Sequence, residues 1–482
     1  MIEANTNKNS SSTLYRTEED SIGVRNIPAD VYYGIQSLRA FENFRITGLT
    51  MHPEIINSIV EIKKAAAITN AEIGILDKRT ADAMVSASDE ILTGKLHENF
   101  IVDPIQGGAG TSLNMNANEV IANRAIELLG GIKGDYSLVN PLDHVNCGQS
   151  TNDVFPSAGK MTALKLLDKA LHELKRLYEN LEKKADEFDD VIKMGRTQLQ
   201  DAVPIRLGQE FKAYGHAVKR DIQRLENARN EMRYLNLGGT AIGTGINADI
   251  QYIKRIVPVL SKVSGLDLEQ ADDLIDATQN LDGYCIVSGA IKTCAVNLSK
   301  MSNDLRLMSS GPKTGLGEIN LPPRQNGSSI MPGKINPVIP EVVNQVAFNI
   351  IGNDMTITMA CEAGQLELNA FEPIIFYNLF QSIETLAYAV GTLTDNCIMG
   401  ISANHEQCRY LVENSIGIVT AISPYIGYMN AAKIAKEALE TGASVRDLIR
   451  SKGLITSEEE LKILDIKAMT SPQILKKDLS AK

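Results

Sequence analysis

Residues 161–188 read MTALKLLDKALHELKRLYENLEKKADEF, and this run restricts the possible folds more than any other segment of the chain. Leucines recur there with charged residues between them, at positions 164, 166, 167, 171, 174 and 177. The spacing predicts an amphipathic helix long enough to belong to a bundle. A second helical pattern runs from Val338 to about Met399, with interruptions at Gly352, Gly364 and Pro373, whereas strand patterns are sparse. The predicted fold class is therefore mostly α, with a central bundle of long helices flanked by two smaller units.

The length of the chain indicates more than one structural unit. At 482 residues it exceeds the size at which a single hydrophobic core normally stops growing. Residues 1–13 are polar and rich in Asn and Ser, which predicts a disordered tail. We expect an N-terminal domain over residues 14–152, a central helical bundle domain over 153–404 and a small C-terminal domain over 405–482. The N-terminal domain carries helical periodicity from about Pro53 to Gly94.

Composition excludes several classes of protein. A net charge of -11, without any block of Lys and Arg, argues against a nucleic-acid partner. The six cysteines are dispersed, with no CxxC pair and no paired histidines, so no metal site is predicted and the thiols are expected to be reduced. No apolar run is long enough to span a bilayer, and no positively charged segment followed by an apolar stretch opens the sequence. We therefore expect a cytoplasmic protein with no membrane partner.

One polar loop interrupts the helical pattern just before Val338. Residues 327–337 read GSSIMPGKINP, in which glycines and prolines break regular hydrogen bonding. The loop carries hydroxyls, an amide and one ammonium group, which together suit a small polyanion. It is not a phosphate-binding P-loop, because one residue too many separates Gly327 from Gly333 and Ile335 stands where Ser or Thr would bind magnesium. The glycines of residues 237–249 are predicted to lie in a loop between helices, since a charged helix and not a buried strand is predicted before them.

Three further polar loops are predicted at residues 107–114, 148–153 and 195–200. The first reads GGAGTSLN, and two interpretations remain open for it. Its glycines let the backbone approach a ligand closely, or the segment begins a helix that Thr111 or Ser112 caps. Because the ends of long helices bring distant loops together, all four loops are expected to meet at one end of the rods or between subunits.

The second and third of these loops add hydrogen-bonding groups. In GQSTND, Ser150, Thr151 and Asn152 supply donors, and Asp153 is expected to cap a helix that starts near Pro156. GRTQLQ contributes Arg196 together with a hydroxyl and amides. Pooled, the four loops offer hydroxyls, amides, Arg196 and Lys334, with little carboxylate or imidazole. That set disfavours metal-dependent hydrolysis, a histidine triad and a glycosidase pair.

The pooled groups suit a dicarboxylate substrate and a reaction in which a carboxylate gains charge. When a proton leaves the carbon next to a carboxylate, an aci-carboxylate forms, and donors aimed at its oxygen lower the barrier. The base must then be a group that its ordinary pKa would not identify as a base. Ser328 and Ser329 are the candidates, provided that Lys334, loop amides and desolvation favour the alkoxide.

The four loops also resemble the motifs of a known family. GSSIMPGKINP is similar to the GSSxMPxKxNP signature of the aspartase/fumarase superfamily, and GGAGTSLNMN, GQSTND and GRTQLQDA resemble its other blocks in the same order. The resemblance extends from Tyr15 into the C-terminal domain. It implies a homotetramer whose central helices pack into one large bundle, with each active site built from three subunits. It also implies a cofactor-independent elimination that releases fumarate.

Within the superfamily the chain resembles the aspartase branch more than the fumarase branch. Fumarases have histidine in the GRTHxQD block, where this chain has Gln198, and His-Pro before the SSND block, where it has Asn140-Pro141. Aspartases carry either histidine or glutamine at the first of these positions. The implied activity is the reversible deamination of L-aspartate to fumarate and ammonia. The alternatives are hydration of fumarate to L-malate and a catalytically silent helical tetramer, as in lens crystallins of the superfamily.

Carried over by motif, the resemblance implies a role for each polar residue of the loops. Ser328 would remove the Cβ proton of the substrate. The β-carboxylate and its aci-form would be held by Thr111, Ser150, Thr151 and Ser329. The α-carboxylate would be held by Thr197, Lys334 and Asn336, and the amino group by Asn152. Gln198 completes the substrate-binding set without an imidazole acid, and Gly327 and Gly333 would let the loop close.

Overall fold

The computed structural model describes residues 14–456 and 465–472, and most of them are helical. The predicted disordered tail at residues 1–13 lies outside the described residues. The α-helices are α1 Ile35–Asn43, α2 Pro53–Glu72, α3 Lys78–Leu92, α4 Thr111–Leu128, α5 Thr151–Glu187, α6 Leu207–Arg229, α7 Ile250–Ser264, α8 Asp276–Gln279, α9 Asp282–Met308, α10 Val338–Glu362, α11 Glu372–Asn396, α12 His405–Glu413, α13 Val419–Ile426, α14 Tyr428–Thr441 and α15 Val445–Ser451. The strands are β1 Tyr15–Asp20, β2 Gly23–Pro28, β3 Ile192–Thr197, β4 Gln200–Arg206, β5 Tyr234–Leu235, β6 Glu269–Gln270, β7 Ile319–Asn320 and β8 Ser402–Ala403. The prediction of a mostly α chain with few strands is confirmed.

The chain divides into two compact units, each built from three separate segments. The first unit contains residues 14–169, Leu225–Lys292 and Ile350–Glu384. The second contains Ala170–Arg224, Thr293–Asn349 and the described residues from Thr385 onward. Parts of the five long helices α5, α6, α9, α10 and α11 occur in both units. The division at 14–152, 153–404 and 405–482 stays a prediction.

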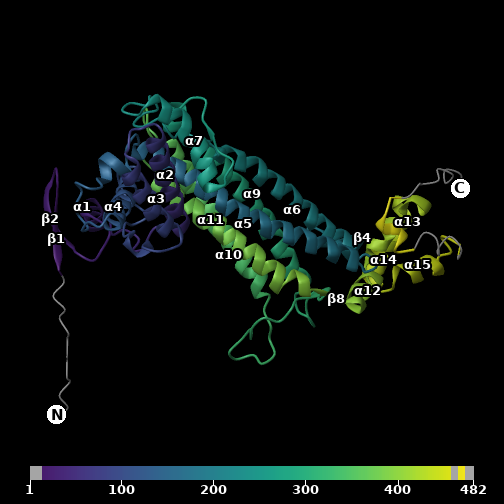
Figure 1. Cartoon of the computed structure of the whole chain (residues 1–482). Coiled ribbons are helices and arrows are strands. Elements are labelled where there is room, and N and C mark those ends of the chain that lie inside the picture. Colours follow the sequence, from purple (N-terminus) through teal and green to yellow (C-terminus); the bar gives the residue numbers. More distant parts are fainter. Residues whose placement is uncertain (1–13, 457–464, 473–482) are drawn as a thin grey trace, which may run out of the picture. The chain divides into compact units, whose positions relative to one another are not determined.

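The long helices pack against one another within each unit (Figure 1). At 37 residues, α5 is the longest of them, and its length is about 55 Å. Its leucines at 164, 167, 171, 174 and 181 are buried, which confirms the amphipathic stripe read from the sequence. In the first unit the Tyr284 hydroxyl of α9 donates to the Pro156 carbonyl of α5 at 2.9 Å. In the second unit Asn297 of α9 donates to both carboxylate oxygens of Asp221 on α6, each at 2.9 Å.

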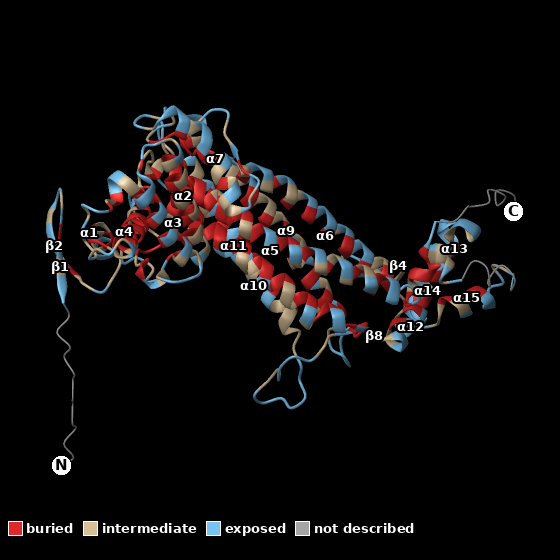
Figure 2. Cartoon of the chain, viewed as in Figure 1, coloured by how far each residue is buried: buried red, intermediate tan, exposed pale blue. Residues whose placement is uncertain are grey.

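The core of the first unit includes the packed helices α2, α3 and α4, where Figure 2 shows buried residues gathered together. Helix α2 begins where His52 accepts a hydrogen bond from the N–H of Glu54, and Pro53 occupies its first turn. The helical stretch predicted from Pro53 to Gly94 is divided in two, because Asp77 caps a new helix. The two helices, α2 and α3, then pack against each other.

Among the described residues, each strand pairs with one other strand, which gives four two-stranded sheets. The β3–β4 hairpin is antiparallel, with Thr197 opposite Gln200 and a register shift between Met194 and Arg196. The prediction of an irregular loop at 195–200 is therefore wrong: most of this segment lies in the two strands, with a tight turn between them. The strands were not recognised from the sequence, because Gly195 and Pro204 are residue types that usually interrupt regular structure.

Helix α5 begins at Thr151, five residues before the start predicted near Pro156. Proline lacks an N–H group, so it leaves a carbonyl in the preceding turn without its helical partner. Here the Asn152 carbonyl oxygen accepts a hydrogen bond from Asn236 Nδ2 at 2.9 Å instead. A side chain from a distant segment therefore makes the proline tolerable inside the helix, which the local sequence could not indicate.

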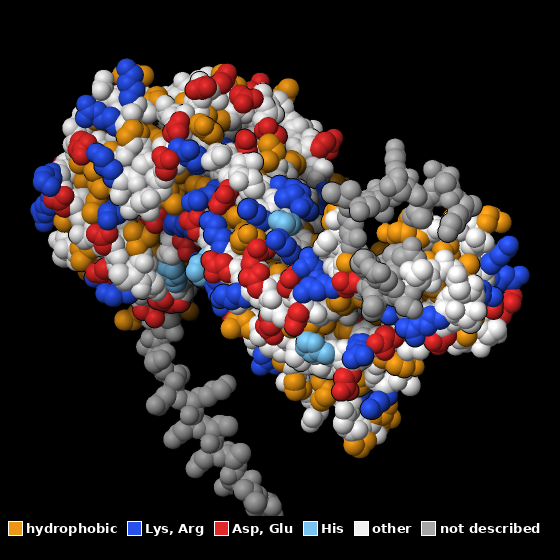
Figure 3. All heavy atoms as spheres, turned by 90° about the vertical axis from the view of Figure 1, so that its right-hand side faces the viewer, with side chains coloured by type: hydrophobic (Ala, Val, Ile, Leu, Met, Phe, Trp, Pro, Cys, Tyr) orange, Lys and Arg blue, Asp and Glu red, His pale blue; other side chains and the backbone are white. Residues whose placement is uncertain are grey.

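In the second unit, helices α12 to α15 pack with the β3–β4 hairpin around one apolar cluster. Its buried members include Met194, Val412, Ile418, Ile422, Ile434, Leu448 and Ile449. On the surface displayed in Figure 3, basic and acidic side chains are interspersed. Among the described residues, no helix is both long and apolar enough to cross a membrane.

Candidate active site

The loop that precedes α10 contains the GSSIMPGKINP segment, and in Figure 1 it projects in green beyond the start of that helix. The Gly327 N–H donates to the Lys334 carbonyl oxygen at 2.9 Å and closes the loop at its base. Asn336 adds a second link, since its Nδ2 donates to the Gly327 carbonyl oxygen at 2.8 Å. A Cβ atom at position 327 would lie 2.4 Å from the Lys334 oxygen, so this closure requires glycine. The prediction of a loop over residues 327–337 is confirmed.

The hydroxyl oxygen of Ser328 accepts two backbone hydrogen bonds inside this loop. The N–H of Ile330 lies 3.2 Å from it and the N–H of Met331 lies 3.0 Å from it. Amide hydrogens aimed at an oxygen stabilise negative charge there, so they favour the alkoxide that a serine base requires. Ser328 is also half-buried, whereas Ser329 is exposed. The local geometry therefore favours Ser328 over Ser329 as the base.

Lys334 and Asn336 lie at the far end of the loop. The Lys334 side chain is exposed. Asn336 is half-buried and holds the Gly327 carbonyl with one amide hydrogen, and the second hydrogen of an Asn amide can still donate to an anion. Asn336 can thus serve as a loop brace and as a carboxylate ligand at the same time.

Thr197 and Gln198 lie at the tip of the β3–β4 hairpin, and both side chains are exposed. Gln198 and Leu199 form the two-residue turn with φ values of 53° and 62°. This left-handed conformation costs a residue with a side chain about 1–2 kcal/mol. Backbone strain of this kind persists only where the surrounding structure holds it, and it is common at functional sites.

The positive charge of Arg196, the residue before Thr197, is not available to bind an anion. Its Nη1 donates to Glu318 Oε1 at 2.8 Å, and the Glu318 side chain is completely buried. The expectation that Arg196 joins Lys334 in binding an anion is not supported, because its charge is already matched within the second unit.

In the first unit, Thr111 is the first residue of α4 and is exposed. Its hydroxyl donates to the Gly108 carbonyl oxygen at 2.7 Å. To bind a carboxylate, the hydroxyl must break this hydrogen bond and rotate its proton toward the carboxylate. Gly110 precedes it with φ of 88°, and a Cβ atom there would lie 2.3 Å from the Phe155 ring. The segment does begin a helix, but the prediction that Thr111 or Ser112 caps it is wrong, because Gly110 is the N-cap and no side chain caps α4. The close approach of this backbone to a ligand stays a prediction.

Ser150, Asn152 and Asp153 surround the start of α5. The Asp153 carboxylate accepts from the Ser150 N–H at 2.9 Å, and the Ser150 hydroxyl oxygen accepts from the Asn152 N–H at 3.2 Å. This reciprocal pair resembles a capping box in which Ser150 precedes the helix and Asp153 is its third residue. Asp153 therefore helps to cap α5, but the prediction that it caps a helix starting near Pro156 is wrong. The Asn152 Nδ2 donates to the Ala241 carbonyl at 2.8 Å. That bond fixes the amide and leaves its Oδ1 as the acceptor that an ammonium group needs.

Asp153 also fastens the loop that follows β5. Its second oxygen accepts from the N–H groups of Gly238 and Thr240, at 2.9 and 3.1 Å. Burial raises the pKa of Asp153 to about 6, although these backbone hydrogen bonds and the nearby Lys63 oppose the shift. The carboxyl therefore joins two segments that are far apart in sequence.

Thr151 is oriented by a buried polar network. Its hydroxyl oxygen accepts from Asn114 Nδ2 at 3.1 Å, which leaves its own proton for a different acceptor. Asn114 also donates to Asn146 Oδ1 at 3.2 Å, and that oxygen receives Lys63 Nζ at 2.8 Å. Lys63 donates to Gln149 Oε1 at 2.9 Å as well. The two predicted loops of the first unit, 107–114 and 148–153, are thereby brought together, with Thr151 prepared as a donor.

Comparison with known proteins identifies the family. The lyase family matches residues 23–352, and the C-terminal domain of fumarase C matches residues 418–471. The chain belongs to this lyase family. An aspartate ammonia-lyase from a Bacillus species is 55% identical over 463 residues, covering 96% of this chain and 99% of the relative.

Two solved structures have the same fold as this lyase. A fumarate lyase described as a delta crystallin, from Brucella melitensis and bound to cobalt, is 49% identical with a TM-score of 0.92, over 95% of this chain and 100% of that one. The class II fumarase of Schistosoma mansoni is 35% identical with the same TM-score, over 95% and 99% of the two chains. The predicted aspartase/fumarase-type fold and superfamily are confirmed.

Lys63 belongs to the polar network of this candidate site, and sequence reasoning missed it. It is 1% exposed, and burial lowers its pKa to about 7, while the Asp153 carboxylate acts in the opposite direction. A signal existed in the sequence, because Lys63 continues the helical spacing of Ile56, Ile59 and Val60 on α2. A lysine at a core position of an amphipathic helix needs buried acceptors.

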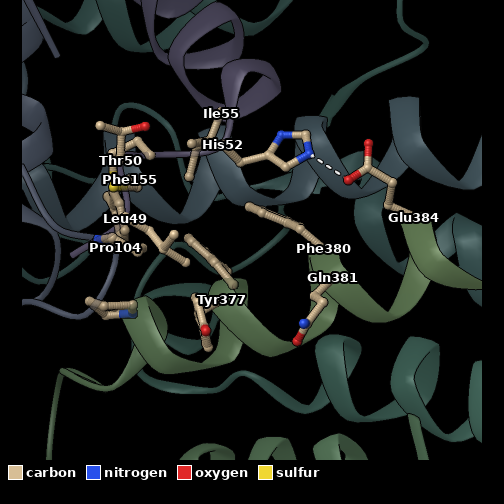
Figure 4. Close-up of a pocket in the computed structure, with 13 residues that line it drawn as sticks. Leu49, Thr50, His52, Ile55, Pro104, Phe155, Tyr377, Phe380, Gln381 and Glu384 are labelled. Carbon is tan, nitrogen blue, oxygen red and sulfur yellow. Dashed lines mark ion pairs between the residues drawn. The ribbon is translucent and has the colours of Figure 1, made fainter. Parts of the chain in front are cut away.

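An apolar cavity of about 200 Å³ in the first unit is separate from the predicted residues of this lyase. Figure 4 shows His52 directed toward Glu384, and their Nε2 and Oε2 atoms are 3.5 Å apart. Phe155, Phe376 and Phe380 form its aromatic walls, and none of the ten predicted site residues lines it. Without Lys or Arg in its lining, this cavity is a poor dicarboxylate site.

Proposed function

We propose that this lyase is an aspartate ammonia-lyase that converts L-aspartate reversibly to fumarate and ammonia. The observation that carries the proposal is the hydrogen bonding of Ser328, whose oxygen receives two amide hydrogens in the loop that also contains Lys334. The substrate is supported by the 55% identity, over nearly the full length, with a Bacillus relative named aspartate ammonia-lyase.

In the proposed reaction, the Ser328 alkoxide takes the proton from Cβ of L-aspartate. The electron pair of the broken C–H bond moves into the β-carboxylate, which becomes an aci-carboxylate with a second negative charge. Hydroxyl donors hold that charge, from Thr111, Ser150, Thr151 and Ser329. Donors in place before the charge develops lower the barrier most effectively. Thr151 suits this role best, because the buried network already occupies its acceptor side.

The second step breaks the Cα–N bond. The electron pair returns from the aci-carboxylate to form the carbon–carbon double bond of fumarate, and the amino group leaves as ammonia. We assign the amino group to Asn152, since its Oδ1 is its remaining acceptor. The α-carboxylate is assigned to Thr197, Lys334 and Asn336, with Gln198 beside them. No cofactor takes part in this scheme.

The direct test follows the absorbance of fumarate with L-aspartate, L-malate or argininosuccinate as substrate. We expect release of fumarate from L-aspartate, with little from the other two compounds. Turnover of L-malate in place of L-aspartate would instead assign the chain to fumarase activity. Failure with every dicarboxylate would support the catalytically silent tetramer.

We further propose a homotetramer with active sites shared between subunits. One face of α10 supports this proposal, because apolar side chains on it are exposed at helical spacing. They are Phe348, Ile351, Met355 and Met359, with exposures of 63%, 39%, 63% and 65%. An apolar stripe of this kind is normally covered by another protein surface.

Subunit mixing tests the shared site. Ser328→Ala and Thr151→Val should each be inactive as pure proteins. If Ser328 and Thr151 serve one site from different subunits, hybrid tetramers contain some sites with both native residues, and activity returns on mixing and reassembly. Absence of recovery in hybrids verified by mass spectrometry would place both residues of a site in the same subunit.

We also place the enzyme in the cytoplasm. The support is its six free cysteines, which fit a reducing compartment. Quenching cells in acid and then alkylating the denatured protein would test this placement, since three of the thiols are buried in the folded chain. Six alkylated thiols would support it, and disulfides would contradict it.

A further inference from the structure

The hairpin turn at Gln198 and Leu199 adopts a conformation that its own sequence does not favour. Two-residue turns with both φ values positive prefer Asn-Gly or Asp-Gly, whereas this turn has Gln and Leu. The turn carries Gln198 and follows Thr197 directly, and both belong to the predicted substrate-binding set. Its conformation must therefore be imposed by structure outside the turn.

A buried ion cluster lies at the base of the hairpin. Glu318 has no exposed side-chain surface, and its Oε1 accepts from Arg196 Nη1 at 2.8 Å. Its Oε2 lies 3.4 Å from Lys193 Nζ, and Lys193 also pairs with Glu210 at 3.0 Å. Both cations belong to β3, so a single carboxylate contacts that strand at two points. The turn residues Gln198 and Leu199 line the same cavity as Lys193 and Arg196.

The backbone of Glu318 is held on both sides. Its N–H donates to the Met308 carbonyl at 2.9 Å, and its carbonyl accepts from the Asn404 N–H at 2.8 Å. These bonds connect it to the end of α9 and to the start of α12. The β3 strand also carries a register shift between Met194 and Arg196, and such bulges change the direction of the chain. Glu318 is thus held in place by its backbone, and its ion pair with Arg196 fixes the strand just after the bulge.

We infer that Glu318 is a positioning residue that holds the hairpin turn through Arg196, so that Thr197 and Gln198 face the substrate carboxylate. Glu318 does not itself touch the substrate. The inference rests on the proposed function only in assigning the α-carboxylate to Thr197. Glu318 also lies ten residues before Ser328 in the chain, so the segment that leads to the serine loop is the one that braces the hairpin.

Steady-state kinetics of Glu318→Gln test the inference. Contacts to the α-carboxylate act equally on bound substrate and transition state, so their loss raises KM rather than lowering kcat. We expect KM for L-aspartate to rise about tenfold or more, with kcat within about threefold of the wild type. The matched control is Asp221→Asn, which removes another fully buried carboxylate of the second unit, paired with Arg224 on α6. This control should lose stability and keep its KM.

Two further variants show whether Glu318 acts through Arg196. Arg196→Lys keeps the charge but loses the guanidinium geometry, so it should raise KM in the same direction, and it serves if Glu318→Gln does not fold. In the double variant of Arg196→Lys and Glu318→Gln, the two effects on KM should not add. Additive effects, or a fall in kcat at unchanged KM in either single variant, would overturn the inference.

A tryptophan reporter separates this inference from the proposed function. The chain has no tryptophan, so Leu199→Trp places a single fluorophore in the exposed turn. Adding Glu318→Gln to that variant should lower the fluorescence anisotropy and increase quenching by acrylamide, whether or not the protein turns over L-aspartate. Unchanged anisotropy and quenching would show that the turn does not depend on Glu318.

Discussion

At the scale of single residues, Glu119 is a carboxyl group that the fold buries completely in order to hold a helix. Its two oxygens accept hydrogen bonds from the N–H groups of Gly34, Gln36 and Ser37 at the start of α1, at 2.8, 2.7 and 3.1 Å. Burial raises the pKa of Glu119 from 4.5 to about 7, although the bonds from Ser37 and Gln36 oppose the shift. The folded protein therefore holds the Glu119 proton more tightly than the unfolded chain does.

This shift predicts a pH dependence of stability. Stabilisation from the protonated form is complete below pH 4.5 and is lost as the pH rises through about 7. Relative to Glu119→Gln, the wild type should lose about 3 kcal/mol of unfolding free energy between pH 5 and pH 8. Urea denaturation of both proteins across that range measures the difference. Parallel curves for the two proteins would mean that Glu119 keeps an ordinary pKa when folded.

Lys63 illustrates what the sequence reveals at this scale and what it does not. Its place on the apolar stripe of α2 could have been noticed, but its acceptors Asn146 and Gln149 lie more than 80 residues further along the chain. Likewise, Asp153 could be read as a helix cap from its neighbours. Its bonds to Gly238 and Thr240 depend on a loop that no local pattern connects to it.

At the scale of elements, the hairpin turn predicts a stabilising substitution. Leu199 has φ of 62° and is 71% exposed, so its side chain adds strain and little packing. Leu199→Gly should exceed Leu199→Ala in unfolding free energy by about 1 kcal/mol, because only glycine adopts this conformation without penalty. Leu199→Ala is the control, since it removes the same packing and keeps the Cβ atom. Equal denaturation midpoints for the two variants would contradict the strain.

The same hairpin marks the limit of sequence reasoning about elements. The 327–337 loop was predictable, because its glycines and prolines have no regular structure to join. Over residues 195–204 the same kinds of residue occur inside a hairpin, where the bulge beside Gly195 and the edge position of Pro204 tolerate them. Glycine and proline therefore mark the polar segments of this chain correctly, but they do not show whether a segment is an irregular loop or a hairpin.

At the scale of the whole molecule, the exposed face of α10 predicts how the chain assembles. Met355 lies within the apolar stripe and is 63% exposed. Met355→Glu should place a charge inside the proposed interface and shift the tetramer to smaller species, since an unpaired charge in an apolar interface is strongly unfavourable. Light scattering after size-exclusion chromatography measures the mass, and activity should fall with it because the proposed sites need several subunits.

An exposed apolar residue outside that face provides the control. Ile132 is 82% exposed in the segment after α4, so Ile132→Glu should leave the mass and the activity unchanged. A Met355→Glu protein that remains a fully active tetramer would show that this face of α10 is not the interface.

The most direct measurement for the whole enzyme is the rate of fumarate release from L-aspartate by Ser328→Ala. Loss of a general base predicts a kcat lower than that of the wild type by about 10² to 10⁴. The variant should keep the mass and the thermal stability of the wild type, since Ser328 hydrogen-bonds only within its own exposed loop. An unchanged kcat would contradict the proposed mechanism and move the base elsewhere, with Ser329 the first residue to examine.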